Sequence, residues 1–420
     1  MFVIFDVIFT VYFILYLPVL FLRGKWPAGF LERFGFIPPE TVRALAVREN
    51  IWVHAVSVGE VAALEGVIRG LQERFPARQV VLTVTTRTGY SFARSKYDPQ
   101  VMVLWSPLDL SITVDSFVRA IRPVVYVAAE TELWPNLFAR LAADKIPILV
   151  LNGRISDQAF PRYCWVRGLL RRTIERVNIF GMQSDLDAER IISLGAAKEN
   201  VQVMGNVKFD NLPAQAGLDP GLKGAGPGQL VLLGGSTHPG EDELLLAVFL
   251  AERKLFPDLR LILVPRHPER ALVIQELVRQ AGLIPVLFSE HSGLPGADEV
   301  LVVDRIGQLL RLYSLATVVF VGKSLTAQGG HNIIEPAMFA KPVITGVNMQ
   351  NFRDITKAFL AGEAVWQVVD APGLQDAVHR LLADPDLRLN MGLRAQQVIR
   401  RNNGATRRAV DLVAGMIKGR

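Results

Sequence analysis

The chain has 420 residues, of which half are apolar and a fifth are charged. This length allows two ordinary domains with their own cores, and the composition is that of a globular α/β protein rather than a disordered one. The single cysteine, Cys164, excludes an intramolecular disulfide and a thiolate metal cluster within one chain. The formal net charge of +6 fits an anionic partner such as phospholipid headgroups or a nucleotide. No run of like charges resembles a nucleic-acid tail, so we expect no nucleic-acid partner.

The first 22 residues are almost wholly apolar and carry one charge, Asp6. As a helix this segment would be about 33 Å long, close to the ~30 Å of a hydrocarbon core, so it can just span if Asp6 lies near the far interface. Arg23 and Lys25 follow and hold the next part of the chain in the cytoplasm by the positive-inside rule. A cleaved signal peptide is the rival, but a basic n-region and a small-residue cleavage site are missing. We expect residues 1–25 to anchor the chain in the inner (cytoplasmic) membrane, spanning it or lying in one leaflet, with the body on the cytoplasmic side.

After the anchor, short buried strands alternate with helical stretches. Strands are expected at residues 51–56, 80–85, 101–105, 124–128 and 148–151, and again at 230–233, 259–264, 284–288, 299–303, 317–321 and 342–345. This alternation predicts βαβ units and parallel sheets. We expect an α/β fold with two Rossmann-like domains that face a cleft, at residues 26–210 and 230–420. The Pro-, Gly- and Ala-rich residues 211–229 are expected to link them, and the last helix can pack back on the first domain.

The loop after residues 317–321 predicts a nucleotide site. Gly329 and Gly330 allow a backbone turn to approach a ligand closely, and a helix is expected to begin near His331 or Asn332. The free N–H groups of that helix start would hold a phosphate, and Glu335 would accept hydrogen bonds from ribose hydroxyls. The alternative is that Asn332 only caps the helix and Glu335 only compensates its dipole.

Two further strand-end loops of the second domain would converge on the same place. Arg266 follows one strand and suits phosphate or base contact, and Ser236 lies in a loop of small residues that a ligand can approach. The alternative for His238 and His267 in these loops is an ordinary loop histidine. The six histidines are scattered and none pairs at ligand spacing, so we expect no metal site.

Loops of the first domain also carry candidates. Ser57, Gly59 and Glu60 are expected in a strand-to-helix turn, whose free N–H groups could hold a carboxylate. The alternative is that this turn only connects the strand to the helix and binds nothing. Glu130 and Glu132 follow a strand beside a tryptophan, which is unusual for a plain connector.

Glu32 lies between the anchor and the first strand, among aromatic and apolar residues. Such a carboxylate has a raised pKa and can accept a proton, as transfer of a sugar to an alcohol requires. The alternative is a surface acid that pairs with Arg33.

Five arginines at 162–176, with Tyr163 and Trp165, predict either a helix that meets lipid phosphates or a solvated face.

The strings LERFGF, HAVSVGE, ETELWPN, NGRIS, GNVKFD, STHPGE, VPRHPER and GGHNIIEP occur in one order along the chain. Together they resemble the 3-deoxy-D-manno-octulosonic acid (Kdo) transferases of glycosyltransferase family 30. The resemblance covers nearly the whole chain, and it implies the GT-B fold. It also implies CMP-Kdo as donor, a tetraacylated lipid A precursor (lipid IVA) as acceptor, and an inverting transfer without metal or other cofactor in lipopolysaccharide inner-core synthesis.

The resemblance also implies roles for individual residues. It makes Glu32 the catalytic base and assigns CMP binding to Arg266, Asn332 and Glu335. It suggests that the acceptor or sugar cleft contains Ser57, Gly59, Glu60, Glu130, Glu132 and Lys208. Lys323 and Gln328 stand where Gly and Arg are expected in relatives, which affects the details of the phosphate loop.

Two alternatives remain open from the sequence. Another GT-B transferase, using UDP-N-acetylglucosamine, fits the GGHN loop and the anchor but not LERFGF and ETELWPN. A non-catalytic, membrane-tethered nucleotide-binding module would bind nucleotide and tolerate loss of Glu32.

Overall fold

The computed structural model describes Asp6 and residues 29–210, 228–291 and 293–418. The expected anchor therefore lies outside the described residues except for Asp6, and so does the expected linker except for its last two positions. Within the described ranges, no helix combines the length and the apolar character needed to cross a bilayer.

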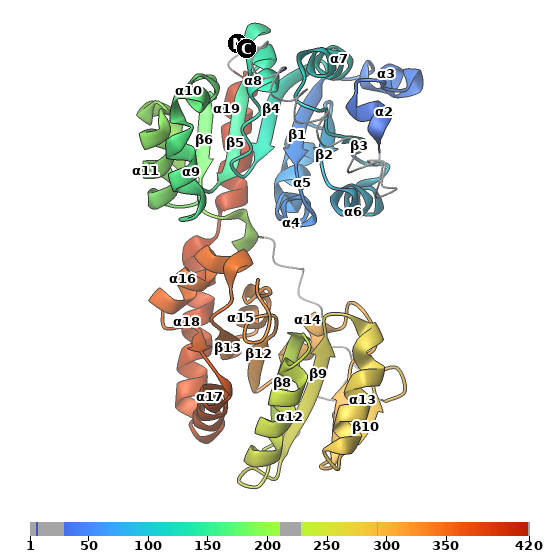
Figure 1. The fold of residues 1–420 in the computed structure, drawn as a ribbon, viewed down its shortest axis with the longest axis vertical. Coiled ribbons are helices and arrows are strands. Elements are labelled where there is room, and N and C mark those ends of the chain that lie inside the picture. Colours follow the sequence, from blue (N-terminus) through green and yellow to red (C-terminus); the bar gives the residue numbers. More distant parts are fainter. Residues whose placement is uncertain (1–5, 7–28, 211–227, 292, 419–420) are drawn as a thin grey trace. The chain divides into compact units, whose positions relative to one another are not determined.

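The chain divides into two compact units (Figure 1). Unit 1 comprises residues 1–211 together with 403–420, and unit 2 comprises residues 212–402. Each unit contains one seven-stranded sheet in which every pairing is parallel. These are two Rossmann-like α/β domains, as the alternation of buried runs and helical stretches predicts.

The sheet of unit 1 has the strand order β3-β2-β1-β4-β5-β6-β7. Its strands are β1 (Asn50–Ala55), β2 (Gln79–Val84), β3 (Met102–Trp105), β4 (Pro123–Ala129), β5 (Ile148–Gly153), β6 (Ile179–Met182) and β7 (Val201–Val203). Its helices are α2 (Phe30–Arg33), α3 (Pro39–Leu45), α4 (Val58–Ala63), α5 (Glu65–Arg74), α6 (Arg87–Tyr97), α7 (Ser111–Ile121), α8 (Pro135–Ala143), α9 (Ala159–Trp165), α10 (Arg167–Ile174), α11 (Asp185–Leu194) and α19 (Ala405–Lys418), with short 3₁₀ turns η1 (Lys198–Asn200) and η2 (Val207–Phe209).

The sheet of unit 2 has the strand order β10-β11-β9-β8-β12-β13-β14. Its strands are β8 (Leu230–Thr237), β9 (Leu259–Pro265), β10 (Ile284–Leu287), β11 (Glu299–Val302), β12 (Val318–Val321), β13 (Val343–Gly346) and β14 (Trp366–Val368). Its helices are α12 (Glu241–Glu252), α13 (Ala271–Gln280), α14 (Leu309–Leu315), α15 (Ile334–Met338), α16 (Arg353–Ala361), α17 (Ala371–Ala383) and α18 (Pro385–Asn402), with η3 (Pro268–Arg270) and η4 (Gln350–Phe352).

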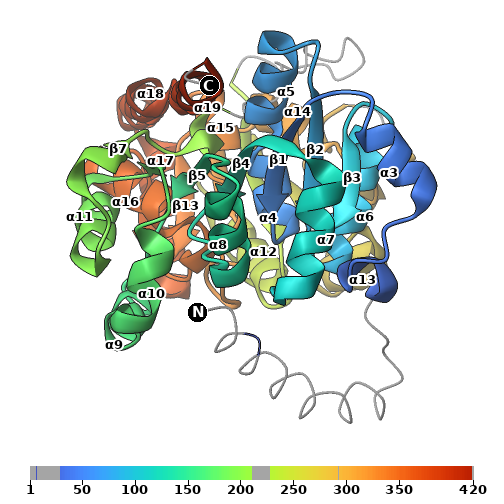
Figure 2. The same ribbon diagram turned by 90° about the horizontal axis from the view of Figure 1, so that it is seen from above.

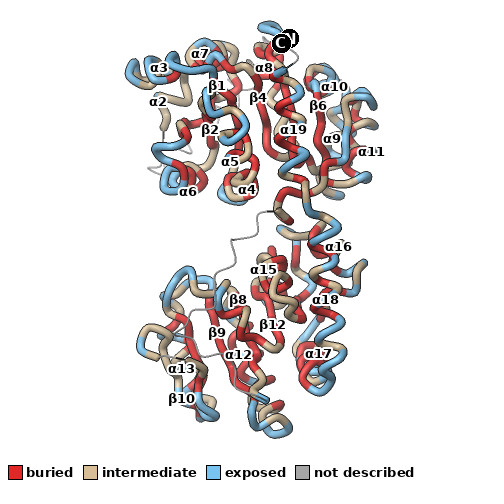
Figure 3. Tube along the Cα trace, turned by 180° about the vertical axis from the view of Figure 1, so that it is seen from behind, coloured by how far each residue is buried: buried red, intermediate tan, exposed pale blue. Residues whose placement is uncertain are grey.

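Both faces of each sheet are buried, which explains why the central strands are continuous apolar runs (Figure 3). In β1, Ile51 and Val53 pack with α4, α5, α6 and α19, while Trp52 points to the opposite face and packs with α7 and α8. Figure 2 shows α5 and α19 on one side of β1 and β4, with α7 and α8 on the other.

Asp6 is bound to the starts of two helices of unit 1. Its carboxylate accepts hydrogen bonds from the Ser111 backbone N–H at 2.8 Å and from the Asn136 side-chain amide at 2.9 Å. Beside it, burial raises the pKa of Asp109 to about 7 even though this carboxylate accepts N–H bonds from Asn136 and Leu137. Asp6 therefore lies against unit 1 rather than at the far interface that a spanning helix would require.

Helix α19 closes the chain back onto unit 1. It packs on α5 so tightly that a Cβ at Gly70 would lie 2.8 Å from a methyl group of Val410. The Asp210 carboxylate caps its start by accepting hydrogen bonds from the backbone N–H groups of Gly404, at 2.7 Å, and Thr406. The last helix is therefore tied to the point where the chain leaves unit 1.

We predict that Asp210→Ala lowers the free energy of unfolding of unit 1 by about 1 kcal/mol, because the Thr406 N–H at the start of α19 loses its acceptor and the Gly404 N–H keeps only Asn403 Oδ1. Denaturant unfolding followed by far-ultraviolet circular dichroism measures the change. Asp411→Ala on the same helix is the control, since its nearest cationic atoms are 3.9 Å away. Equal losses in the two variants would contradict the capping role.

Candidate active site

The first strand of each sheet lies where the strand order reverses. Strand β1 lies between β2 and β4, and β8 lies between β9 and β12. At such a point the loops that follow two neighbouring strands run in opposite directions and leave a crevice at the carboxyl ends of the strands. Open parallel sheets bind their ligands in this crevice. Most of the candidate residues lie at or after the ends of β1, β4, β8, β9 and β12, so the structure places them at the carboxyl edge of one sheet or the other. Glu32 and Lys208 are the exceptions, because they lie on α2 and η2.

Glu32 lies on the short helix α2, beside the end of β3. Its Oε1 accepts a hydrogen bond from the Trp105 backbone N–H at 2.8 Å. Burial raises the pKa of Glu32, although this hydrogen bond and the charges of Arg33 and Arg94 oppose the increase. The expected raised pKa is therefore present, and the carboxylate is a stronger base than an exposed glutamate.

An aromatic stack holds Glu32 in place. The Trp105 indole stacks on Tyr90 with ring centres 3.9 Å apart, and the Arg33 guanidinium lies 4.6 Å from the indole centre. Arg33 also donates to the Thr85 carbonyl at the end of β2, so it is not simply the surface partner of Glu32. Gly29 permits the approach, because a Cβ there would lie 2.1 Å from the indole.

Ser57, Gly59 and Glu60 form the turn between β1 and α4. The Ser57 hydroxyl donates to Glu60 Oε1 at 2.9 Å, and Glu60 Oε2 accepts the Val56 N–H at 2.7 Å. The Glu60 N–H bonds back to Ser57 Oγ at 3.4 Å. The turn was expected to offer free N–H groups to a ligand carboxylate, but Glu60 and Ser57 already satisfy two of them. Gly59 is exposed, with open space where a side chain would extend.

Glu130 and Lys208 meet at the neighbouring strand end. Glu130 has a left-handed backbone with φ 52°, and its N–H bonds to the Leu151 carbonyl. The Lys208 ammonium lies 3.8 Å from Glu130 Oε1. The intervening Thr131 exchanges two hydrogen bonds with the Arg154 backbone, at 2.6 and 2.9 Å, which fixes the loop that carries both predicted acids.

Glu132 is the most perturbed acid of this group. Burial, together with the charges of Glu60 and Glu130, raises the pKa of Glu132 to about 7. Burial, with the charge of Glu132 as a smaller cause, raises the pKa values of Tyr126 and Tyr163. A proton can therefore be gained or lost here near neutral pH.

Three polar groups near Glu132 were not predicted from the sequence as site residues. His54 Nε2, Tyr126 Oη and Trp134 Nε1 are buried without a hydrogen-bond partner among the described residues. The His54 ring lies 5.7 Å from the Trp134 ring and 6.5 Å from the Tyr126 ring. Burial and the charge of Arg33 lower the pKa of His54 to about 3, so this imidazole is neutral.

In unit 2, the Glu241 carboxylate joins the two loops that flank the switch point. Oε2 accepts hydrogen bonds from the N–H groups of His238 at 2.9 Å and Lys323 at 2.8 Å. Oε1 accepts those of Ser324 at 3.0 Å and Leu325 at 3.1 Å. Glu241 was not predicted as a site residue. The only hint was an acid in the first turn after a loop of small residues.

Gly329 and Gly330 both have left-handed backbones, with φ 124° and 71°. A Cβ on Gly329 would lie 2.7 Å from the Asn351 amide, and one on Gly330 would lie 2.4 Å from the Met349 sulfur. The close approach that requires glycine is therefore to the loop after β13. Whether a ligand also approaches these glycines stays a prediction.

Asn332 and Glu335 interact directly. The Asn332 amide donates to Glu335 Oε1 at 3.1 Å, and its Oδ1 accepts the Ile334 N–H at 3.0 Å. The expected helix start near residue 331 or 332 is wrong, because α15 begins at Ile334 and has only five residues. Such a helix has a weak dipole, so a phosphate here would depend on side chains instead. Burial raises the pKa of Glu335.

Arg266 and Ser236 lie at the same edge of this sheet. Arg266 is exposed, and its guanidinium has no ion pair or hydrogen bond to another described residue. Ser236 has a left-handed backbone, with φ 54°, at the irregularity between Gly235 and Thr237 in the pairing of β8 with β9. Three histidines, His238, His267 and His331, follow β8, β9 and β12. Within the described residues, no group of His, Cys, Asp and Glu side chains is arranged to hold a metal ion.

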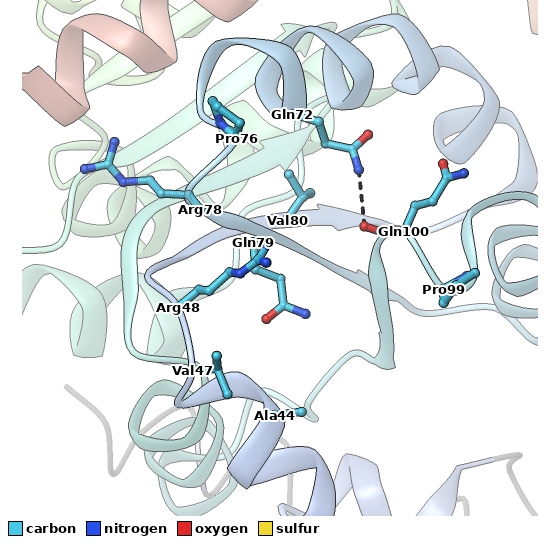
Figure 4. A pocket seen from close by; sticks show the side chains of 10 residues that line it. All are labelled: Ala44, Val47, Arg48, Gln72, Pro76, Arg78, Gln79, Val80, Pro99 and Gln100. Atoms are coloured by element: carbon cyan, nitrogen blue, oxygen red, sulfur yellow. Dashed lines mark hydrogen bonds between the residues drawn. The ribbon is translucent and has the colours of Figure 1, made fainter.

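Two other surface features are an exposed tryptophan among arginines and a shallow pocket. Helices α9 and α10 expose Trp165, whose exposed fraction is 89%, among the arginines Arg162, Arg167, Arg171 and Arg172. A shallow pocket at the start of β2 is lined by Gln79 and Val80 and bridged by a hydrogen bond from Gln72 to the Gln100 carbonyl (Figure 4). It lies at the amino-terminal edge of the sheet, away from the switch point.

Comparison with known proteins identifies relatives along the whole chain. The model of a family described as 3-deoxy-D-manno-octulosonic-acid transferase (kdotransferase) matches residues 28–211. A 3-deoxy-D-manno-octulosonic acid transferase of Haemophilus influenzae is 32% identical over 392 residues, which cover 91% of this chain and 90% of that protein. The protein of the same description in Bordetella pertussis is 32% identical over 398 residues, with 92% of each chain covered. UDP-GlcNAc 2-epimerase of Neisseria meningitidis, solved bound to UDP-GlcNAc, has a TM-score of 0.58 at 14% identity and covers 88% of this chain and 100% of its own, which shows the fold alone.

We predict that Glu132→Gln stabilises the protein more at high pH than at low pH. The unfolded Glu132 carboxyl ionises near pH 4.3, whereas the folded one does so near pH 7, so the wild type loses stability across this interval and the amide variant does not. Urea unfolding should show a gain of about 1–2 kcal/mol near pH 8 and a much smaller one near pH 5.

Glu130→Gln is the control for Glu132→Gln, because it removes a neighbouring carboxylate that is paired with Lys208. It should give no comparable gain. A gain in Glu132→Gln that does not change with pH would contradict the raised pKa.

Proposed function

Because the chain belongs to the Kdo transferase family, and is therefore a glycosyltransferase, we propose that it transfers Kdo from CMP-Kdo to a lipid A precursor in lipopolysaccharide synthesis. The observation that carries the proposal is the identity of 32% over more than nine-tenths of the chain to transferases of that description. The tetraacylated precursor lipid IVA is the acceptor that we propose.

Glu32 is the proposed general base. Its half-buried carboxylate has a raised pKa and one hydrogen bond, at Oε1, so that Oε2 has no hydrogen-bond partner among the described residues. In the proposed step, Glu32 takes the proton of an acceptor hydroxyl, whose oxygen attacks the anomeric carbon of Kdo. The bond from that carbon to the CMP phosphate breaks, its electron pair leaves with CMP, and the anomeric configuration inverts.

Unit 2 is the proposed donor-binding unit. Arg266 at the end of β9 offers an unpaired guanidinium to the phosphate, where it would stabilise the charge that develops on the leaving group. Asn332 and Glu335 are proposed to contact the nucleoside, and their mutual hydrogen bond holds the two side chains in one orientation. Gly329, Gly330 and Ser236 are proposed to shape the backbone beside the bound nucleotide.

Unit 1 is the proposed unit for the acceptor and the sugar. Glu60, Glu130, Glu132 and Lys208 gather at the ends of β1 and β4, where carboxylates and an ammonium suit the hydroxyls of a sugar. The exposed Trp165 and the arginines of α9 and α10 suit the interface of an anionic membrane. We propose association with the inner leaflet of the cytoplasmic membrane, and the contacts of Asp6 with unit 1 favour a monotopic attachment over a spanning anchor.

To test this function, the purified chain is incubated in detergent with CMP-Kdo and the tetraacylated precursor. Release of CMP and a mass increase of one or more Kdo units would support donor and acceptor together. Competition by UDP rather than CMP, with no Kdo product, would instead support a transferase that uses a UDP-sugar.

We predict that Glu32→Gln lowers kcat by roughly 10²- to 10⁴-fold, because the amide cannot accept the proton. Glu32→Ala should abolish transfer, while CMP binding stays intact in both variants because unit 2 is unchanged. Glu40→Gln on α3, an exposed acid, is the matched control and should retain full activity. Retained turnover in the Glu32 variants would refute the base assignment.

We also predict that a chelator leaves the transfer rate unchanged, since the residues proposed to stabilise the leaving phosphate are cationic side chains. The rate is measured with and without EDTA. Loss of activity that Mg²⁺ restores would show that a metal ion takes part.

A further inference from the structure

Two histidines of unit 2 form a hydrogen-bonded pair that the proposed mechanism does not use. His238 follows β8 and His331 lies in the loop after β12, so the pair bridges the switch point. Their Nε2 atoms are 3.2 Å apart, and the rings are stacked with centres 5.4 Å apart. At this distance one Nε2–H donates and the other Nε2 accepts, so the two facing nitrogens share one hydrogen.

Cationic side chains surround the pair. After burial, the charges of Lys323 and His267 lower the pKa of both rings, that of Arg266 lowers the pKa of His331, and that of Arg270 lowers the pKa of His238. The His267 ring lies 6.1 Å from the His238 ring. Arg270 is neutralised by the buried Asp242, with N and O atoms 2.5 Å apart. Lys323 and Arg266 have no ion-pair partner among the described residues.

The acidic groups nearby do not cancel this charge. The Glu241 carboxylate is fully buried and bound by four backbone N–H groups, and Glu269 lies 3.7 Å from His267 on the exposed side. Burial, then His238 and the cations, lower the pKa of His331 to about 3. Burial also lowers the pKa of His238, against the opposing effect of Glu241. Both rings are therefore neutral near pH 7 in the free protein.

We propose that the His238–His331 pair, flanked by Lys323 and Arg266, binds the phosphate of the nucleotide and takes up one proton as it does so. This inference rests on the proposed function, in which unit 2 binds a cytidine nucleotide. A phosphate monoester carries a charge of about −1.5 to −2, which favours an imidazolium beside it. The protonated ring keeps its Nε2–H bond to its partner and gains an N–H at Nδ1 as a donor.

The proton uptake would act on the leaving group. The phosphate of a donor sugar nucleotide is a diester with one negative charge, and the CMP that leaves carries nearly two at neutral pH. A pair that gains a proton as this charge appears offsets it within the site. The pair is then a positioning and charge-compensating element for departure of CMP, distinct from the base Glu32.

The sign of the pH dependence follows from the same argument. The anion raises the pKa of the pair above its low value in the free protein. Affinity for CMP should therefore increase as pH falls through the pKa of the bound pair, over the range above about pH 6 in which CMP remains a dianion.

The experiment is isothermal titration calorimetry of the full chain in detergent with CMP. It is done at about pH 7.5, where CMP is almost wholly a dianion because its second pKa is about 6. Two buffers with different enthalpies of ionisation give the number of protons taken up. The wild type should take up roughly 0.5 to 1 proton for each CMP bound.

His238→Gln and His331→Gln each retain a hydrogen-bonding group near the position of Nε2 but cannot become imidazolium. Both should take up no proton and bind CMP roughly tenfold more weakly. His267→Gln is the matched control, because this third histidine has a side-chain exposure of 58% and makes no hydrogen bond to the pair. It should take up protons as the wild type does.

The outcomes separate the inference from the proposed function. CMP binding without proton uptake, or with uptake that survives both pair variants, would overturn the inference and leave the donor site in place. Absence of CMP binding to the wild type would overturn both. Uptake lost in the two pair variants and retained in His267→Gln would support the pair as the phosphate-linked proton site.

Discussion

The reversal of strand order beside β1 and β8 is the constraint on which both candidate sites depend. Each sheet is wholly parallel, so every strand returns through a crossover and the carboxyl ends all lie at one edge. Where the order reverses, the loops diverge and side chains from distant parts of the chain meet. In unit 2 this meeting is fixed by one carboxylate, that of Glu241, which binds the N–H groups of both flanking loops. The histidine pair and Lys323 owe their positions to it.

The two units place opposite charges at their switch points. In unit 1, burial raises the pKa of Glu60 and of Glu132, and Glu32 at the end of β3 shares this property. Carboxyl groups with a raised pKa can bind the neutral hydroxyls of a substrate and can accept a proton from one of them. In unit 2, Lys323 and Arg266 flank two neutral imidazoles, which suits an anion. This division matches a reaction in which one substrate is deprotonated and the other loses a phosphate.

The fold was largely predictable, because buried strands of a parallel sheet are apolar runs between helical stretches. The structure confirms the strands expected near residues 51–56 and 259–264 and the parallel sheets that they build. It adds β6, β7 and β14, which were not predicted. Strands β7 and β14 have three residues each and are only partly buried, so they lack the apolar run that marks a strand. Strand β6 is fully buried, but its apolar run has only four residues and contains Gly181.

The site was only partly predictable, because its key contacts join residues far apart in sequence. Glu32 and Glu132 could be selected from their neighbours along the chain. Three of the four backbone partners of Glu241 lie 82 to 84 residues away in sequence, and the Nε2 contact of His238 with His331 spans 93 residues. No local sequence pattern predicts contacts of this kind. The same limit explains the misplaced start of α15, since the loop before it is held by hydrogen bonds to residues 348–351, which follow β13.

The most direct test of the central claim, that the nucleotide binds at the switch point of unit 2, is amide hydrogen exchange with and without CMP. The account predicts slower exchange in residues 234–241, 265–270 and 322–335, the three loops that follow β8, β9 and β12. Exchange in β10 and at the amino-terminal edge of the same sheet should not change. Protection confined to unit 1 or to that opposite edge would contradict the account.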